Sequence, residues 1–205
     1  KKIIELALKF NVCLIPYGGG TNVTRALSVP ENEQRTVVSI DTRRLSKIEW
    51  INKEDRRVCV EAGITGKNLD ELLKKEGFMI GHEPDSVELS TIGGWIATNA
   101  SGMKKNKYGN IEDIVENVHL VTPRGEINQM KPISRGSIGF KPQNMLFGSE
   151  GNLGIITKAI LKIHERPEAQ EYNSVLFKSW GEGVTFLKEL SKTNYIPASV
   201  RLVDN

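Results

Sequence analysis

Short helical and strand-like hydrophobic patterns alternate along the first part of the chain. Apolar residues at most positions from Ile3 to Phe10 predict an amphipathic helix, and the apolar run 12–15 that follows predicts a short buried strand. Stretches rich in β-branched residues predict three more strands, at residues 36–40, 48–51 and 58–61. Small α and β elements are therefore expected to alternate in this region.

The next predicted helix has a start and an end that can be read from the sequence. Thr65 is suited to cap its N-terminus, and Gly77 is suited to end it. Between them, Leu69, Leu72 and Leu73 supply the apolar positions of an amphipathic helix.

The second half of the chain is richer in β patterns. Residues 115–127 predict a hairpin whose turn contains Gly125, and residues 155–163 predict another strand. After Pro167 the pattern predicts a strand, a helix and a strand, at residues 174–177, 184–190 and 198–203. Such a unit cannot bury both of its faces alone, so we expect it to open a further domain.

The composition is that of an ordinary globular protein. Of the 205 residues, 39% are hydrophobic and 26% are charged, and no apolar run is long enough to cross a bilayer. Because 28 basic residues are balanced by 25 acidic ones, the chain lacks the strong positive charge of nucleic-acid binders, and we expect no nucleic-acid partner. Any membrane association is expected to be peripheral.

The start of the chain and its cysteines refine this picture. The chain opens on Lys1 within a helical pattern, with no initiator Met and no targeting peptide, and we expect it to be a fragment. Cys13 and Cys59 lie in apolar strand-like stretches, which are more typical of buried thiols than of a disulfide or a metal site. This favours a reducing compartment.

Other polar candidates have simple interpretations. His82, His119 and His164 lack the spacing of metal ligands, and we expect no metal site. The lysine-rich run 104–107 is typical of a solvated loop. Because it follows Gly102, a second hypothesis is that it helps to attract a phosphorylated substrate.

The most informative motif is Ile-Pro-Tyr-Gly-Gly-Gly-Thr-Asn at residues 15–22. Three glycines after an apolar strand allow successive N–H groups to point into one concavity, where they can hold an anion such as a phosphate. The run lacks the G-x-G-x-x-G spacing, and no Gly-Lys-Ser/Thr follows it, so neither classical nucleotide fingerprint is present. Taken alone, it is more typical of a tight strand-to-loop turn.

Three later segments share the character of this glycine loop. They lie at residues 83–94, 97–102 and 148–156, and each combines Gly, Ser, Thr or Asn with apolar residues. Small hydroxyl and amide side chains beside exposed backbone N–H groups suit a large ligand that carries both a diphosphate and a flat heterocycle.

In their order along the chain, these motifs resemble the FAD-binding domain of the vanillyl-alcohol-oxidase/PCMH flavoprotein superfamily. They are Ile-Pro-Tyr-Gly-Gly-Gly-Thr-Asn (15–22), Glu-Pro-Asp-Ser (83–86), Ser-Thr-Ile-Gly-Gly-Trp (90–95), Ser-Gly-Met-Lys-Lys-Asn-Lys-Tyr-Gly-Asn-Ile-Glu-Asp (101–113) and Gly-Ser-Glu-Gly-Asn-Leu-Gly (148–154). Within the superfamily, the stretches 82–86, 102–106 and 197–205 resemble the ether-lipid synthase family. The resemblance covers nearly the whole chain.

The resemblance implies an α+β fold. Residues 1–168 would form a PCMH-type FAD-binding domain of two α/β subdomains, divided near residue 63, with FAD between them. Residues 169–205 would be the truncated start of a cap domain.

The resemblance also implies FAD as a non-covalent cofactor, because the glycine loop contains neither the His nor the Cys that attaches flavin in some members. The implied cofactor-binding residues are Pro16, Tyr17, Gly18, Gly19, Gly20, Thr21 and Asn22 around the diphosphate, and Asp85, Ser86, Val87, Glu88, Leu89, Ser90, Thr91, Thr98, Asn99, Ala100, Ser101, Glu150, Gly151, Asn152, Leu153, Gly154, Ile155 and Ile156 around the rest of FAD.

The chain departs from the family pattern in two places. Asn152 stands where the family commonly has Thr, which keeps a small hydrogen-bonding side chain. The stretch from Arg135 to Gln143 matches related dehydrogenases only loosely, so we assign it no role.

For the ether-lipid synthase family, the implied reaction exchanges the acyl group of acyl-dihydroxyacetone phosphate for a fatty alcohol, with FAD as an electron sink. The implied partners are these two substrates and a second copy of the full-length protein, and the implied location is the peroxisome. Catalytic groups are expected mainly in cap and C-terminal regions, so no catalytic residue is assigned. Two alternatives stay open: an FAD-dependent D-2-hydroxy-acid dehydrogenase and a non-catalytic nucleotide-binding module.

Overall fold

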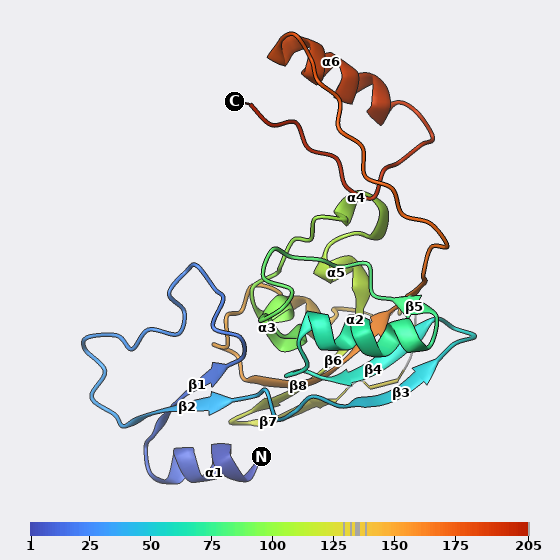
Figure 1. Cartoon of the computed structure of the whole chain (residues 1–205). Coiled ribbons are helices and arrows are strands. Elements are labelled where there is room, and N and C mark those ends of the chain that lie inside the picture. Colours follow the sequence, from blue (N-terminus) through green and yellow to red (C-terminus); the bar gives the residue numbers. More distant parts are fainter. Residues whose placement is uncertain (129, 132, 134–135, 138, 205) are drawn as a thin grey trace.

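The strands of the central region pair into one five-stranded antiparallel sheet in the order β3-β4-β8-β6-β7 (Figure 1). The computed structural model describes residues 1–128, 130, 131, 133, 136, 137 and 139–204. The strands of the sheet are β3 (Ile48–Asn52), β4 (Arg57–Glu61), β6 (Val115–Thr122), β7 (Gly125–Asn128) and β8 (Ile155–Lys162). β8 is central and pairs with β4 and β6, so residues as distant in sequence as Cys59 and Ile160 are neighbours.

Several strand predictions are confirmed by this sheet. The hairpin expected at residues 115–127 is formed by β6 and β7, with Thr122 opposite Gly125 at the turn. The Thr122 hydroxyl donates to the Gly125 carbonyl at 2.9 Å and accepts from the Gly125 N–H at 3.1 Å. The turn is therefore fixed by one side chain as well as by glycine.

A smaller unit forms at the N-terminus from α1 (Lys2–Lys9), β1 (Cys13–Tyr17) and β2 (Val37–Asp41). β1 and β2 are parallel, with Ile15 opposite Ser39. Parallel neighbours need a long connection, which here contains the glycine loop. Figure 1 shows this connection extending outward from the two strands, on the left of the molecule.

One face of the large sheet is covered by α2 (Gly66–Lys75) and the short helices near it (Figure 1). As predicted, Thr65 caps α2, and its hydroxyl accepts a hydrogen bond from the Asn68 N–H at 3.3 Å. Leu69 and Leu73 are fully buried in the core, whereas Leu72 is 38% exposed. The other helices are α3 (Ile92–Ala97), α4 (Lys105–Tyr108), α5 (Ile111–Ile114) and the 3-10 helix η1 (Pro142–Met145).

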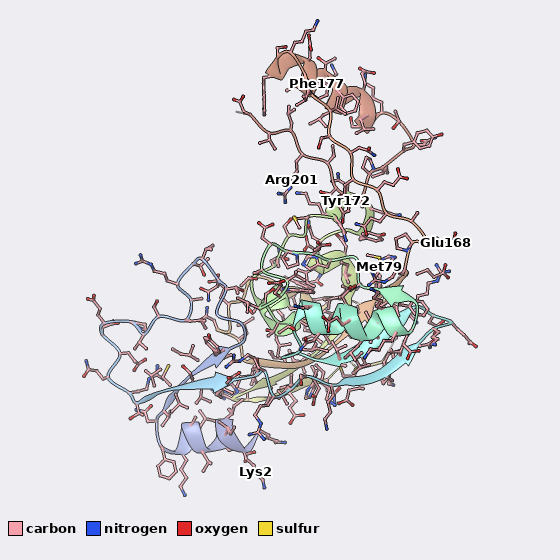
Figure 2. All side chains as sticks on the ribbon, in the orientation of Figure 1. Lys2, Met79, Glu168, Tyr172, Phe177 and Arg201 are labelled. Carbon is pink, nitrogen blue, oxygen red and sulfur yellow. The ribbon has the colours of Figure 1, made fainter. Side chains whose placement is uncertain are left out.

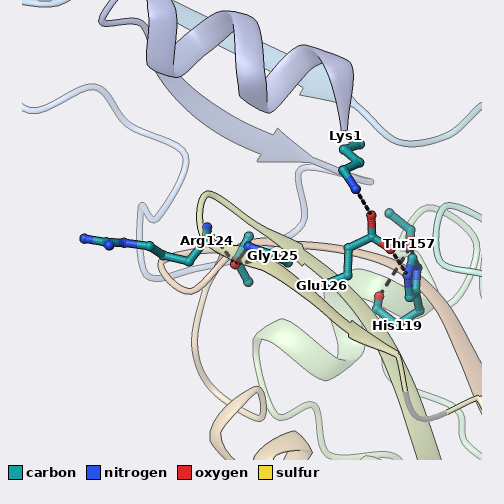
Figure 3. A network of polar contacts seen from close by, with 7 residues as sticks. Lys1, His119, Arg124, Gly125, Glu126 and Thr157 are labelled. Atoms are coloured by element: carbon teal, nitrogen blue, oxygen red, sulfur yellow. Dashed lines mark hydrogen bonds and ion pairs between the residues drawn. The ribbon is translucent and has the colours of Figure 1, made fainter.

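A line of polar contacts joins the N-terminal unit to the large sheet (Figure 3). Lys1 Nζ lies 3.5 Å from a carboxylate oxygen of Glu126 on β7, and the other oxygen lies 3.3 Å from His119 Nε2 on β6. His119 Nδ1 is in turn 2.5 Å from the Thr157 hydroxyl on β8. The hydrogen bond from His119, together with Lys1, holds the pKa of the Glu126 carboxyl below its usual value. The contacts therefore link α1 to three strands of the sheet.

Both cysteines are free thiols. Cys59 is buried on β4, as predicted, and burial raises the pKa of its thiol to about 11. Cys13 on β1 is only partly buried.

The C-terminal segment corrects two strand predictions. Residues 174–177 and 198–203 are not strands, although the helix between them is present as α6 (Trp180–Ser191). Extended chain becomes a stable strand only beside a partner, and the described residues offer none here: Leu176 is 98% exposed and Val203 is 80% exposed. Figure 2 shows Phe177 of this segment and Lys2 of α1 at opposite ends of the molecule.

The division into domains at residues 63 and 168 stays a prediction. The five-stranded sheet contains β3 and β4 from before residue 63 and β6, β7 and β8 from after it. The short strands β5 (Phe78–Met79) and β9 (His164–Glu165) also pair. This pairing joins the segment that follows α2 to the segment that follows β8.

Replacing Leu69 by Ala should destabilise the fold strongly, because a fully buried side chain leaves a cavity when it is truncated. We expect Leu69→Ala to lower the free energy of unfolding by about 2–5 kcal/mol, measured by urea denaturation. Leu72→Ala on the same helix is the matched control and should cost about 1 kcal/mol or less, since that side chain is partly exposed. Equal losses for the two variants would contradict the burial that separates them.

Candidate functional site

The four Gly, Ser, Thr and Asn segments of the sequence meet around one cavity of about 370 Å³. The cavity lies between the end of β1, the loop that precedes α3, the end of α3, and the turn that leads into β8. Its size falls within the range of small-molecule and cofactor sites. Segments that are far apart in sequence therefore build one site.

The glycine loop lies against the backbone that precedes α3. A Cβ atom on Gly18 would overlap the Thr91 hydroxyl, and one on Gly19 would overlap the Leu89 carbonyl oxygen. Gly20 has a φ of +68°, in the left-handed region that favours glycine. Each of the three glycines therefore has a structural requirement, because the loop packs too closely against its neighbours to accept side chains.

Thr91 connects this loop to the sheet. Its hydroxyl accepts a hydrogen bond from the Gly94 N–H at 3.2 Å and so caps α3. The next two N–H groups, of Ile92 and Gly93, donate to the carbonyls of Ile64 and Ala62 at 3.0 and 2.7 Å. The start of α3 is thereby fixed to the chain that leaves β4, and the wall facing the glycine loop is rigid.

A buried hydrogen-bond chain supports the same wall. Trp95 Nε1 donates to the Ser90 hydroxyl at 2.7 Å, and this hydroxyl donates to the Ser86 carbonyl at 2.8 Å. Ser90 and Trp95 are both buried, so the indole N–H is satisfied without water. The loop 86–90 is therefore held in one conformation.

Two cavity residues adopt a backbone conformation that is uncommon outside glycine. Asn99 and Glu150 both have a φ of +49°. Asn99 follows α3, and the Glu150 N–H donates to the Ala97 carbonyl at 2.8 Å. Strained conformations of this kind persist where the surrounding structure enforces them, and they gather at binding sites.

Most of the residues implied to bind FAD line the cavity. They are Pro16, Tyr17, Gly18, Gly19, Gly20, Thr21, Asn22, Ser86, Ser90, Thr91, Thr98, Asn99, Ala100, Ser101, Glu150, Gly151, Gly154 and Ile156. The structure therefore brings together the four segments that the sequence motifs singled out.

The remaining implied residues do not line the cavity: Asp85, Val87, Glu88, Leu89, Asn152, Leu153 and Ile155. Val87 and Glu88 face a second hollow beside α2. The side chain of Leu89 is exposed, and only its carbonyl lies against the glycine loop. Asp85 lies 3.8 Å from Arg201 of the C-terminal segment.

Only some residues of the motif at 148–156 line the cavity. Asn152 and Leu153 are exposed at the turn. Ile155 begins β8, where successive side chains point to opposite faces, so that Ile156 and not Ile155 lines the cavity. The family's Thr and this chain's Asn152 therefore differ at a position outside the cavity lining.

The sequence analysis missed several lining residues: Val23, Thr24, Ala26, Leu27, Thr42, Pro84, Gly93, Gly94, Trp95, Ala97 and Ser149. Six of them, Pro84, Gly93, Gly94, Trp95, Ala97 and Ser149, lie inside the motifs that the sequence singled out but were not among the residues implied to bind FAD. Thr42 also had a usable signal. Thr42 directly follows β2, and ligands commonly bind at the carboxyl ends of parallel strands. Its hydroxyl donates to the Tyr17 carbonyl at the end of β1, at 3.0 Å.

The cavity lining is almost free of charge. Glu150 is the only charged residue among the described residues that line it. A diphosphate in this cavity would therefore be held by backbone N–H groups, hydroxyls and amides rather than by Lys or Arg. No group of three or more His, Cys, Asp or Glu side chains suited to a metal ion occurs in the described parts of the chain, and no helix there is long and apolar enough to span a membrane.

His82 lies behind the wall of the cavity. It is 2% exposed, and its ring contacts Trp95 edge-on with the ring centroids 4.8 Å apart. Neither ring nitrogen has a hydrogen-bond partner among the described residues. Burial lowers the pKa of His82 to about 4, so the imidazole is neutral at physiological pH.

The loop with Lys104 offers less free charge than its sequence indicates. Lys104 forms an ion pair with Glu83, and Lys107 lies over the Tyr108 ring at 5.4 Å. The hypothesis that this loop attracts a phosphorylated substrate stays a prediction. The residues from Arg135 to Gln143, which received no role, lie partly outside the described residues.

Comparison with known proteins gives the class of this fold and site. A family model described as an FAD binding domain matches residues 1–131, and the chain belongs to this FAD-binding family. The implied α+β fold and the implied cofactor, FAD, are thereby confirmed at the level of the family.

Individual proteins are similar to this chain over nearly its whole length. The alkyldihydroxyacetonephosphate synthase of Caenorhabditis elegans is 47% identical over 204 residues, which cover 100% of this chain and 34% of that protein. A solved structure of alkyldihydroxyacetonephosphate synthase matches with a TM-score of 0.89 and 40% identity, over 97% of this chain and 36% of the other. The mitochondrial cytochrome-type D-lactate dehydrogenase of Kluyveromyces lactis is 29% identical over 205 residues, covering 100% of this chain and 35% of that protein. The chain spans about a third of the length of these relatives.

Substituting Gly19 by Ala should weaken FAD binding, because the added methyl group would push the glycine loop away from the Leu89 carbonyl. Overpacking of this kind costs about 1–3 kcal/mol, so we expect the dissociation constant for FAD to rise about tenfold or more, measured by quenching of flavin fluorescence. Gly181→Ala is the control, since a Cβ there would meet only Ser179 Oγ at 4.0 Å. A folded Gly19→Ala variant with unchanged affinity would show that the close approach is not needed for binding.

Stability should fall on acidification because of His82. Its pKa is about 4 when folded and about 6.5 when unfolded, so below pH 6.5 the unfolded chain takes up the proton first and is favoured. From pH 7.5 to pH 5, His82 should reduce the free energy of unfolding by about 2 kcal/mol. His82→Asn should remove that part of the pH dependence in urea denaturation at the two pH values. Burial also lowers the pKa of His164, so His164 contributes a loss of stability at acidic pH both in the parent protein and in the His82→Asn variant.

Proposed function

We propose that this chain is the FAD-binding part of an alkyldihydroxyacetonephosphate synthase. The observation that carries the proposal is the cavity of about 370 Å³ that the four Gly, Ser, Thr and Asn segments line together, with the glycine loop packed closely against the Leu89 carbonyl and the Thr91 side chain. The similarity to alkyldihydroxyacetonephosphate synthases over the whole chain supports the assignment to that enzyme.

The site residues have distinct proposed roles. The backbone N–H groups of residues 17–22 hold the diphosphate of FAD, and the absence of Lys and Arg from the described lining agrees with recognition by N–H groups and hydroxyls. Thr98, Asn99 and Ser101 offer hydroxyl and amide groups to the remaining polar parts of the cofactor. The rigid loop 86–91 keeps the cofactor in one position relative to α3.

The proposed reaction exchanges the acyl group of acyl-dihydroxyacetone phosphate for a fatty alcohol, giving an alkyl ether and a free fatty acid. Bound FAD supplies an electron sink for such an exchange, which is redox-neutral overall. This chain's residues bind and orient the cofactor and exclude water from it. We assign no catalytic residue to the chain.

The setting of the enzyme is also a proposal. The sequence resemblance supports a peroxisomal enzyme of ether-lipid synthesis that acts as a homodimer and meets its lipid substrates at a membrane surface.

The two alternatives differ in their support and in the behaviour they predict for the protein. A D-2-hydroxy-acid dehydrogenase is supported by the similarity to D-lactate dehydrogenase, but the identity of 29% is well below the 47% for the synthase. A non-catalytic nucleotide-binding module would bind FAD and transform no substrate.

Incubation of the full-length protein with palmitoyl-dihydroxyacetone phosphate and a labelled fatty alcohol should place the label in an ether lipid. Free fatty acid should appear in equal amount, because the exchange releases one carboxylate for each ether formed. The products are measured by lipid extraction and mass spectrometry.

D-lactate serves as the control substrate in the same preparation. Bleaching of the flavin by D-lactate, with no label in ether product, would establish the dehydrogenase alternative. Tight FAD binding with neither reaction would establish the non-catalytic alternative.

A further inference from the structure

The loop that follows the glycines forms one wall of the cavity but is itself poorly packed. Between Thr21 and Leu27 it contributes lining residues, while Val23 is 95% exposed and the stretch up to residue 36 is mostly exposed. Figure 1 shows the loop extending away from β1 and β2 rather than lying on the sheet. Buried apolar surface therefore does little to hold this wall in place.

One hydrogen bond ties the loop to the rest of the protein. The Thr24 hydroxyl donates to Glu150 Oε1 at 2.7 Å, across 126 residues of sequence. Within the described chain, the other side-chain hydrogen bonds of residues 21–35 stay inside the loop: Asn22 accepts from the Ala26 N–H, and Glu33 pairs with Arg35. Thr24 is therefore the single side-chain tether between residues 21–35 and the opposite wall.

The acceptor side of this contact is firmly anchored. The Glu150 N–H donates to the Ala97 carbonyl at 2.8 Å, and its backbone has a φ of +49°. The next residue, Gly151, has a φ of +84°, and a Cβ there would lie 3.3 Å from Pro16 Cδ. The Glu150 carboxylate thus projects from a firmly held turn. The loop that contains Thr24 is the less well packed of the two partners.

The contact also involves Glu150, the one charged side chain among the described residues of the lining. The Thr24 hydroxyl donates to this carboxylate from the loop side, so the charged group has a hydrogen-bond partner in the loop. A hydrogen bond to a charged acceptor is also stronger than one between neutral groups. The pair therefore holds the loop against the opposite wall through a charge-assisted hydrogen bond.

We propose that Thr24 is a positioning residue for the cofactor: its hydrogen bond to Glu150 holds the loop 21–27 against the cavity and slows the release of FAD. The proposal rests on FAD binding by this chain, not on the reaction that the whole enzyme performs. It assigns to the Thr24–Glu150 pair a kinetic role in cofactor retention.

The first test compares FAD release from Thr24→Val, Thr24→Ser and the parent protein, each loaded with FAD. Loss of one hydrogen bond to a charged acceptor corresponds to about a tenfold faster release from Thr24→Val, followed as the rise of free flavin fluorescence after dilution. Thr24→Ser keeps the hydroxyl and should restore slow release. Ser28→Ala is the matched control, because it removes a hydroxyl from the same loop at an exposed position that does not line the cavity.

The second test needs no cofactor. In the FAD-free protein, trypsin should cut after the exposed Arg25 faster in Thr24→Val than in the parent or in Ser28→Ala, with each rate normalised to cleavage of the denatured chain.

A third test returns to the FAD-loaded protein. Thr24→Val and Glu150→Ala each remove the same hydrogen bond, so the double variant should release FAD more slowly than the product of the two single effects. Release equal to that product would overturn the coupling between the two residues.

The outcomes distinguish failure of the Thr24 tether from failure of the proposed function. Unchanged FAD release and unchanged cleavage at Arg25 in Thr24→Val would overturn the tether. Failure of the parent protein to bind FAD would overturn the proposed function instead, while the cleavage rates in the FAD-free protein would still report whether Thr24 holds the loop.

Discussion

The site depends on the contact between two stretches of backbone, the glycine loop and the residues that lead into α3. Gly18 and Gly19 lie so close to Thr91 and Leu89 that any Cβ atom would overlap them. The opposing stretch is itself held by the hydrogen bonds of Ile92 and Gly93 to the chain that leaves β4. The wall beside the glycine loop is thus held to the central sheet by main-chain hydrogen bonds, and the loop meets that wall at the Leu89 carbonyl and the Thr91 side chain.

The sequence predicted those parts of the fold whose causes are local. The β-branched strands, the hairpin with Gly125 and the helix capped by Thr65 all depend on neighbouring residues, and all are present. Residues 174–177 and 198–203 have the composition of strands but no partner among the described residues, and pairing is not a local property. The order of strands, with β8 in the centre, could not be read from any one segment.

The same distinction explains how well the site could be predicted. Glycine and small polar motifs record a demand on the backbone, so residues 16–22 were found as a block. Motifs give no sign of which side chains turn inward, so Val87 and Glu88 were included although they face α2. Thr24 was missed because its place in the lining follows from its contact with Glu150, which only the folded chain brings together. Thr42 could have been included from its position directly after β2.

The central place of β8 has a consequence for how the chain acquires its structure. β4 and β6 are both made before β8 during synthesis, and each keeps an unpaired edge until residues 155–162 are available. Open strand edges are sites where chains associate wrongly, and contacts between distant residues form slowly. The cavity therefore cannot be completed by the glycine loop's own region, because its last wall is formed by the residues that lead into β8, the strand that closes the sheet.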